Sequence, residues 1–204
     1  MKILIQTLYP APYRVSLYEL LAQQHDIVVF FEKDNDNRNP LYCTYSNKFT
    51  YFLLGSKEAD EAYQNAMDNI KQYDFVMLYE YHTILSAKLI LNCILHRVNY
   101  AINCDGAVEI SHKFPRKQIK TFFIKHAALC LAGGNKAKEY FKTYGANDEK
   151  IYIHNFTSIY ESDIAPFISS EDRQRKRKAK GIAGETASVS VGRLIKSKQF
   201  DLLI

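Results

Sequence analysis

Seven short apolar runs, separated by stretches of mixed polarity, constrain the fold of this chain more than any other feature of its sequence. Several are rich in β-branched and aromatic residues, such as "DIVVFF" at residues 26–31. This composition is typical of strands that are buried on both faces of a sheet. Strands that alternate with helices along a chain usually pair in parallel. With right-handed crossovers, the pattern predicts an α/β fold with a doubly wound, mostly parallel sheet. The predicted strands are residues 3–5, 26–31, 49–54, 74–78, 100–104, 128–132 and 150–154.

The segments between these runs have helical periodicity. Pro12 suits the first turn of a helix, because its missing N–H group would have no partner there. On that helix one face carries four apolar side chains, Tyr13, Leu17, Leu20 and Leu21. Further helices are predicted over residues 57–72, 83–97 and 115–126, and from a Gly-Gly pair to about residue 144. Thr83 is a suitable N-cap for the second of these.

The character of the sequence changes at Asn155. Residues 155–187 have little periodicity and a dense charge run, "RQRKRKAK", and we predict a linker that contains a short basic helix. Residues 188–195 begin a new apolar strand, and the helix after it is interrupted at Ile204. A strand and part of a helix cannot bury a core of their own. We therefore expect residues 1–154 to form one domain and residues 188–204 to begin a truncated second one.

Composition limits the class of protein. With 204 residues, 47% of them hydrophobic, the chain can bury one sizeable core. Its formal net charge of +5 favours an anionic partner without naming one. Cys43, Cys93, Cys104 and Cys130 form no CxxC pair, which indicates free thiols in a reducing compartment. The sequence has neither a signal peptide nor an apolar stretch of ~20 residues, so we expect a cytoplasmic protein, at most peripheral to a membrane.

Polar residues that directly follow a predicted strand are candidates for a site, because ligands of doubly wound sheets bind at the carboxyl ends of the strands. The first strand is followed by Thr7, Tyr9, Tyr13 and Arg14. Arg14 either holds an anionic group at the start of a helix or is simply solvated. No G-x-G-x-x-G motif accompanies them, which removes the main support for a dinucleotide-dependent dehydrogenase.

Two further strand ends carry side chains that could act in catalysis. Glu80 and His82 follow the fourth strand and are either a general acid–base pair or part of an ordinary polar loop. Asn103 and Asp105 follow the fifth strand. Asp105 could accept hydrogen bonds from sugar hydroxyls, stabilise a developing cation, or cap the turn beside Gly106. The histidines lack metal-ligand spacing, so we expect no metal and no cofactor.

Glycine and basic residues mark three more segments, each with two readings. Gly133 and Gly134 precede a helix, where the backbone could approach a phosphate or sugar oxygen, or where a tight turn needs glycine for steric reasons. Residues 111–126 interleave basic and aromatic side chains, as in a helix on an anionic membrane surface or one packed on a core. Residues 173–180 have no aromatic side chains for base stacking, which favours a solvated helix and disfavours nucleic acid as a partner.

The final segment, "SVSVGRLIKSKQFDLLI" at residues 188–204, resembles the opening strand, loop and helix of the donor domain in retaining GT-B glycosyltransferases of group 1, the GT4 family. Upstream, "YPAPYR", "DGA" and "KAKEYFKTYGANDEKIYIHNFTS" are similar to the capsular and exopolysaccharide branch of that family. The resemblance spans essentially the whole chain. It implies that residues 1–154 are a Rossmann-like, acceptor-binding domain.

The resemblance also implies roles for individual residues. Gly192, Arg193 and Lys198 match the positions that bind the diphosphate of the donor, and Asp105 matches the strand-end position near the reacting sugar. The implied donor is a nucleotide-diphosphate sugar, and the implied acceptor is a lipid-linked or other saccharide in cell-surface polysaccharide synthesis at the inner membrane face. On this interpretation the chain alone is inactive. The alternative is a non-catalytic anion- or nucleotide-binding α/β module.

Overall fold

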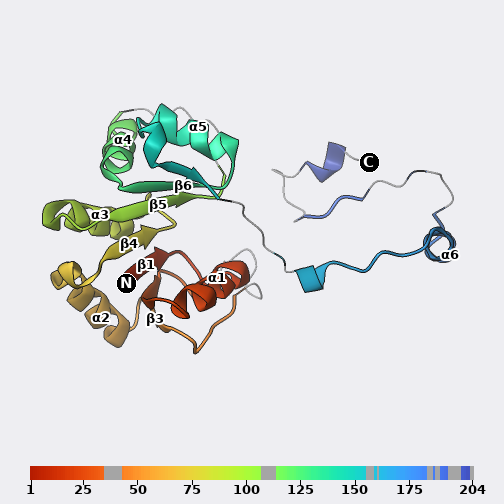
Figure 1. Cartoon of the computed structure of the whole chain (residues 1–204), viewed down its shortest axis with the longest axis horizontal. Helices are drawn as coiled ribbons and strands as arrows, with labels where there is room; N and C mark the ends of the chain where they lie inside the picture. The colour runs from red at the N-terminus through yellow and green to blue at the C-terminus, as the bar shows by residue number, and fades with distance from the viewer. Residues whose placement is uncertain are drawn as a thin grey trace. The chain divides into compact units, whose positions relative to one another are not determined.

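The computed structural model describes residues 1–34, 43–106, 114–154, 159, 161–182, 186, 189–192 and 199–202. The chain divides into two compact units, Met1–Ile159 and Tyr160–Ile204. The first unit contains the sheet and the helices that cover it (Figure 1). Its core is the part that positions the site.

Within the described residues, all seven predicted strands form, and they pair in parallel as one sheet of order β3-β2-β1-β4-β5-β6-β7. The order reverses between β1 and β4, so this pair is the topological switch point of the sheet. The strands are β1 (Lys2–Thr7), β2 (Asp26–Phe31), β3 (Thr50–Leu53), β4 (Phe75–Leu78), β5 (Tyr100–Cys104), β6 (Leu129–Ala132) and β7 (Ile151–Ile153).

The helices lie close to their predicted positions. Pro12 starts α1, and Thr83 caps α3 in a reciprocal capping box with Ser86, as expected from their residue types. The helix predicted over residues 57–72 forms in two parts. The α-helix α2 covers Lys57–Asp68, and a short 3-10 turn, η2 (Ile70–Gln72), follows it. The α-helices of this unit are α1 (Pro12–Ala22), α2 (Lys57–Asp68), α3 (Ile84–His96), α4 (Arg116–His126) and α5 (Asn135–Thr143).

The sheet separates two hydrophobic cores. Along β1, Ile3 and Ile5 join the core that α1 covers, whereas Leu4 between them joins the core built with α2, α3, α4 and α5. Successive side chains of a strand point to opposite faces, so the two cores lie on the two faces of the sheet. The doubly wound, Rossmann-like α/β fold is therefore confirmed.

The four apolar side chains that share one face of α1 are not the ones that the helix buries. Leu17 and Leu20 are exposed, and the helix instead buries Arg14, Val15 and Tyr18. The Tyr18 ring packs edge-on against the rings of Phe49 and Tyr79, with centroids 5.9 and 5.8 Å away. The positions of Phe49 and Tyr79 determine which face of α1 is turned toward the core. The spacing of the leucines within the helix does not reveal where these partners lie.

The second unit contains the predicted basic helix, α6 (Ser170–Ala179), which Ser169 caps and which buries no residue. A strand was expected over residues 188–195. Its described part, residues 189–192, is not a strand, and the remainder lies outside the described residues. A strand needs a hydrogen-bonded neighbour, and none is described in this unit. Only a 3-10 turn, η6 (Phe200–Leu202), is described where the last helix was predicted.

Candidate functional site

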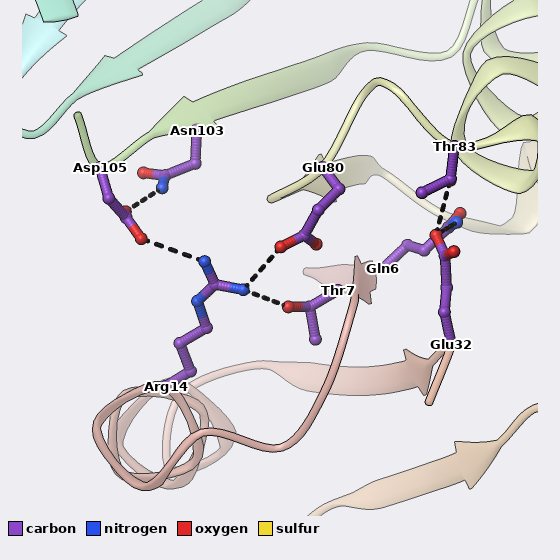
Figure 2. Close-up of polar contacts among 8 residues, drawn as sticks. All are labelled: Gln6, Thr7, Arg14, Glu32, Glu80, Thr83, Asn103 and Asp105. Atoms are coloured by element: carbon purple, nitrogen blue, oxygen red, sulfur yellow. Dashed lines mark hydrogen bonds and ion pairs between the residues drawn. The ribbon is translucent and has the colours of Figure 1, made fainter. Parts of the chain in front are cut away.

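Three side chains, one from the end of β1 and two from the loops after β4 and β5, meet at the guanidinium of Arg14 (Figure 2). Its Nη1 donates to Thr7 Oγ1 at 2.5 Å and to Glu80 Oε1 at 3.0 Å. Its Nη2 donates to Asp105 Oδ2 at 3.0 Å. Thr7, Arg14, Glu80 and Asp105 are called the arginine cluster below. All four were named separately at strand ends in the sequence, and the fold brings them together.

The topology explains why these residues meet. Thr7 ends β1, Glu80 follows β4, and Asp105 follows β5, so all three lie at the carboxyl edge of neighbouring strands. Arg14 reaches the same edge from the first turn of α1. Because the edge between β1 and β4 is the switch point, the cluster occupies the place where doubly wound sheets bind ligands.

Burial differs sharply within the cluster. The side chains of Arg14 and Glu80 are 10% and 12% exposed, whereas that of Asp105 is 31% exposed. Two carboxylates thus face one guanidinium, and only Asp105 keeps substantial contact with solvent. A ligand at this edge would therefore meet the Asp105 carboxylate rather than the positive charge of Arg14.

The ionisation of Arg14 and Glu80 follows from this arrangement. Burial by itself lowers the pKa of Arg14, but the carboxylate of Glu80, with smaller contributions that include Asp105, raises that pKa above its ordinary value. Burial raises the pKa of Glu80, and the charge and hydrogen bond of Arg14 oppose this shift. The ring of Tyr79 lies 4.5 Å from the guanidinium carbon, a cation–π contact that further holds Arg14 in place.

A second set of contacts fixes Asp105 from the other side. Asn103 Nδ2 donates to Asp105 Oδ1 at 2.5 Å, and Asn103 Oδ1 lies 3.0 Å from Nε2 of His154. Asn103 is buried at the end of β5, and His154 follows β7. His154 was not among the sequence-predicted site residues, because the strand predicted over residues 150–154 included it, whereas β7 ends at Ile153.

Gly133 brings the end of β6 against Asp105. A Cβ atom at Gly133 would lie 2.7 Å from the carbonyl oxygen of Asp105, closer than atoms can approach. The Gly133 N–H also donates to the carbonyl of Cys104 at 2.9 Å. These contacts support the steric reading of this glycine. Gly134 is the N-cap of α5, as expected of a glycine directly before a helix.

Three other predicted residues, His82, Tyr13 and Tyr9, differ in their surroundings. His82 is exposed, and among the described contacts no hydrogen bond or ion pair joins it to Glu80, so an acid–base role for the two stays a prediction. The Tyr13 ring lies 5.8 Å from the Arg14 guanidinium, and Tyr9 is partly buried in the loop before α1. Ligand binding by these two tyrosines stays a prediction.

The donor-side residues and the basic segment are only partly described. Gly192 is described and exposed, whereas Arg193 and Lys198 lie outside the described residues. In α4, Phe123 is buried, and Phe114, Arg116 and Lys117 around its start are exposed. One face of this helix therefore packs on the core while basic and aromatic side chains remain accessible. Residues 111–113 lie outside the described residues.

Among the described residues, no group of three or more His, Cys, Asp or Glu side chains could hold a metal ion. In the same part of the chain, no helix combines the length and apolar character needed to cross a bilayer.

Comparison with known proteins identifies the fold. No family model and no curated protein matches the sequence. Among solved structures, HepE from Anabaena in complex with UDP matches with a TM-score of 0.54 and 14% identity over 89% of this chain and 50% of that chain. HepE in complex with UDP-glucose matches with a TM-score of 0.50, 16% identity and the same coverage. A UDP-GlcNAc 2-epimerase from Methanocaldococcus jannaschii also matches, with a TM-score of 0.46 and 15% identity over 75% of this chain and 45% of that one. The chain spans about half the length of the HepE structures and shares the fold of that half, which is GT-B-like.

Proposed function

We propose that this chain is the acceptor-binding part of a glycosyltransferase that transfers a sugar from a nucleotide-diphosphate sugar to a saccharide or lipid-linked saccharide. The observation that carries the proposal is the carboxylate of Asp105, held by Arg14 and Asn103 at the switch point of the sheet and 31% exposed. A fixed carboxylate at this edge suits an acceptor with several hydroxyl groups.

The carboxylate of Asp105 has a chemical role in this proposal. It accepts a hydrogen bond from a sugar hydroxyl or stabilises the positive charge that develops at the anomeric carbon during transfer. Its two tethers keep it in one orientation, so no reorganisation is needed during the reaction. The family resemblance adds the finer expectation of retention at the anomeric carbon, with Arg193 and Lys198 stabilising the diphosphate leaving group.

The solved structures support a nucleotide sugar as the donor class. HepE, which shares the fold over half of its length, was solved with UDP, with UDP and glucose, and with UDP-glucose. The resemblance of residues 188–204 to a donor-domain opening suggests the same class of ligand. Function in capsular or exopolysaccharide synthesis at the cytoplasmic membrane face belongs to this proposal as well.

Transfer is tested with the complete gene product, including any reading frame that continues past Ile204. The assay supplies UDP-glucose and other nucleotide-diphosphate sugars together with lipid-linked saccharides, and it follows release of the nucleoside diphosphate and labelling of the acceptor. Asp105→Asn should lower kcat by about a hundredfold. A matched exposed carboxylate variant, Asp68→Asn, should leave kcat unchanged.

The alternative of a non-catalytic nucleotide-binding module makes a different prediction for the same assay. The complete product would bind a nucleotide or nucleotide sugar but label no acceptor, and Asp105→Asn would leave that binding unchanged. Such a result would overturn the transferase proposal.

A further inference from the structure

A pocket of about 450 Å3 lies outside the arginine cluster, at the carboxyl ends of β2 and β3 and beside α2 and α3. Its volume falls within the range of about 300–1,000 Å3 that is usual for small-molecule sites. It shares the ligand-binding edge of the sheet with the cluster, because Gln6 and Thr7 are neighbours at the end of β1. Gln6 contacts the pocket residue Glu32, and Thr7 contacts Arg14.

Glu32 is the fixed polar group of this pocket. Its Oε1 accepts hydrogen bonds from Gln6 Nε2 at 2.7 Å and from Thr83 Oγ1 at 2.8 Å (Figure 2). Both bonds go to Oε1, and within the described residues none goes to Oε2. The carboxylate is therefore held through Oε1, and the side chain that carries it lines the pocket.

The groups that orient Glu32 are themselves held. Gln6 is buried, and its Oε1 lies 3.2 Å from the hydroxyl of Tyr63, which donates to it. Thr83 is the N-cap of α3, where its hydroxyl oxygen accepts a hydrogen bond from the Ser86 N–H at 3.0 Å. This support is independent of any ligand, so Glu32 is preorganised, and preorganisation lowers the cost of binding.

The other lining groups narrow the class of ligand. Lys88 is exposed at the pocket and forms no ion pair in the described part of the chain, while Asp60 adds a second carboxylate. Two carboxylates against one lysine disfavour a phosphate, and the described residues offer no metal-ligand cluster. Partly buried apolar side chains, Leu54, Met67 and Leu85, complete the lining. Oriented acceptors, one flexible donor and apolar walls match a neutral ring with several hydroxyl groups and C–H faces.

We propose that this pocket is a saccharide-binding subsite in which Glu32 Oε2 accepts hydrogen bonds from sugar hydroxyls and Lys88 donates one. The subsite would hold a sugar unit of the acceptor that lies beyond the unit at Asp105. The assignment of the sugar to an acceptor rests on the proposed function, but its binding in the pocket can be measured without any transfer reaction.

The test is a ¹H–¹⁵N NMR titration of the 204-residue chain with D-glucose, D-galactose and N-acetyl-D-glucosamine, each at millimolar concentration. At least one sugar should give saturable shifts centred on Gly55, Gln64 and Lys88. Glu32→Gln should raise the Kd for that sugar by about tenfold, because hydrogen bonds to a charged acceptor are strong. Glu61→Gln, a matched change on the exposed surface of α2 that does not line the pocket, should leave the Kd unchanged.

A second variant keeps the test independent of folding. Lys88→Met changes an exposed side chain and should weaken the same sugar severalfold, even if Glu32→Gln proves unstable. The proposal is overturned if no sugar gives saturable shifts at the pocket, if both pocket variants bind like the wild type, or if inorganic phosphate saturates the pocket instead. If the complete gene product transfers sugar but no sugar binds in this pocket, only the subsite proposal is wrong. If a sugar binds in the pocket but no transfer occurs, only the proposed function is wrong.

Discussion

The guanidinium Nη2 of Arg14 lies 3.0 Å from the carboxylate Oδ2 of Asp105, although 91 positions separate the two residues in the sequence. This contact joins the first turn of α1 to the loop after β5, across the switch point of the sheet. It also changes what Arg14 is expected to do. Arg14 pairs with Glu80 and Asp105 inside the chain, so its positive charge faces two carboxylates rather than solvent.

Replacing Arg14 by Met should destabilise the chain strongly. The substitution leaves Glu80 buried without its cation, and breaking a buried pair in this way costs about 3–5 kcal/mol. Urea denaturation measures the free energy of unfolding. Arg175→Met, which breaks the exposed pair with Asp172, is the matched control and should have little effect. Equal losses in the two variants would contradict a buried, structural role for Arg14.

The stability of the chain should depend on pH through Glu80. Burial raises its pKa in the folded state, so the folded chain keeps a proton that the unfolded chain releases near the ordinary value of 4.5. The stability that Glu80 contributes is fully present below that value and is lost as the pH rises through the folded pKa. We therefore compare the free energy of unfolding of the wild type with that of Glu80→Gln at each pH. The difference, wild type minus variant, should fall as the pH rises from about 4.5 through the folded pKa of Glu80, and it should stay constant above that pH. A constant difference would show that burial does not control this carboxyl group.

Gly133→Ala should disturb Asp105 without touching its side chain. The new Cβ would lie 2.7 Å from the Asp105 carbonyl oxygen, and the backbone has to shift, at a cost of about 1–3 kcal/mol. Gly106→Ala is the matched control, because nothing lies within 4 Å of its Cβ position. The two variants are compared by their thermal unfolding midpoints and by the backbone NMR chemical shifts of residues 103–105. If both variants behave alike, the close approach of β6 to Asp105 is not significant.

The four cysteines should differ in reactivity. Burial raises the pKa of Cys93 to about 12 and that of Cys130 to about 11, so both thiols stay protonated and covered at neutral pH. Labelling with a thiol reagent at pH 8, followed by peptide mass spectrometry, should modify the partly exposed Cys43 first. Cys93 and Cys130 should react only after unfolding in urea. Fast labelling of either in the native chain would be inconsistent with the fold.

Basic side chains around the start of α4 should bind anionic membranes. Arg116 and Lys117 are exposed beside Phe114, and each basic residue near an anionic surface contributes about 1 kcal/mol. Sedimentation with phosphatidylserine vesicles should show binding that weakens with salt, because exposed charges are screened within ~8 Å at physiological ionic strength. Replacing Arg116 and Lys117 by Glu should abolish it. The control is the double variant Lys57→Glu with Lys71→Glu, which changes the charge equally in α2 and η2 and should reduce vesicle binding only slightly. Equal loss of binding in the two double variants would exclude a docking site at α4.

The sequence alone determined the sheet and most of its helices. These elements depend on local chemistry, which a short stretch of sequence contains. The local signals were apolar runs of strand length, Pro12 at the start of a helix and Thr83 as a helix N-cap. The rule that ligands bind at strand ends also selected Arg14, Glu80, Asn103 and Asp105 one by one. Each was chosen for its position after a strand, without knowledge of its partners.

Only the tertiary structure decided how these residues combine. Whether Arg14 meets solvent, an anion or a carboxylate depends on strand order, and strand order places β4 beside β1 although β2 and β3 come between them in the chain. The same long-range packing buried Tyr18 in place of Leu17 and brought His154 to Asn103. Such contacts arise from the packing of whole elements against one another, and no short window of sequence contains that information.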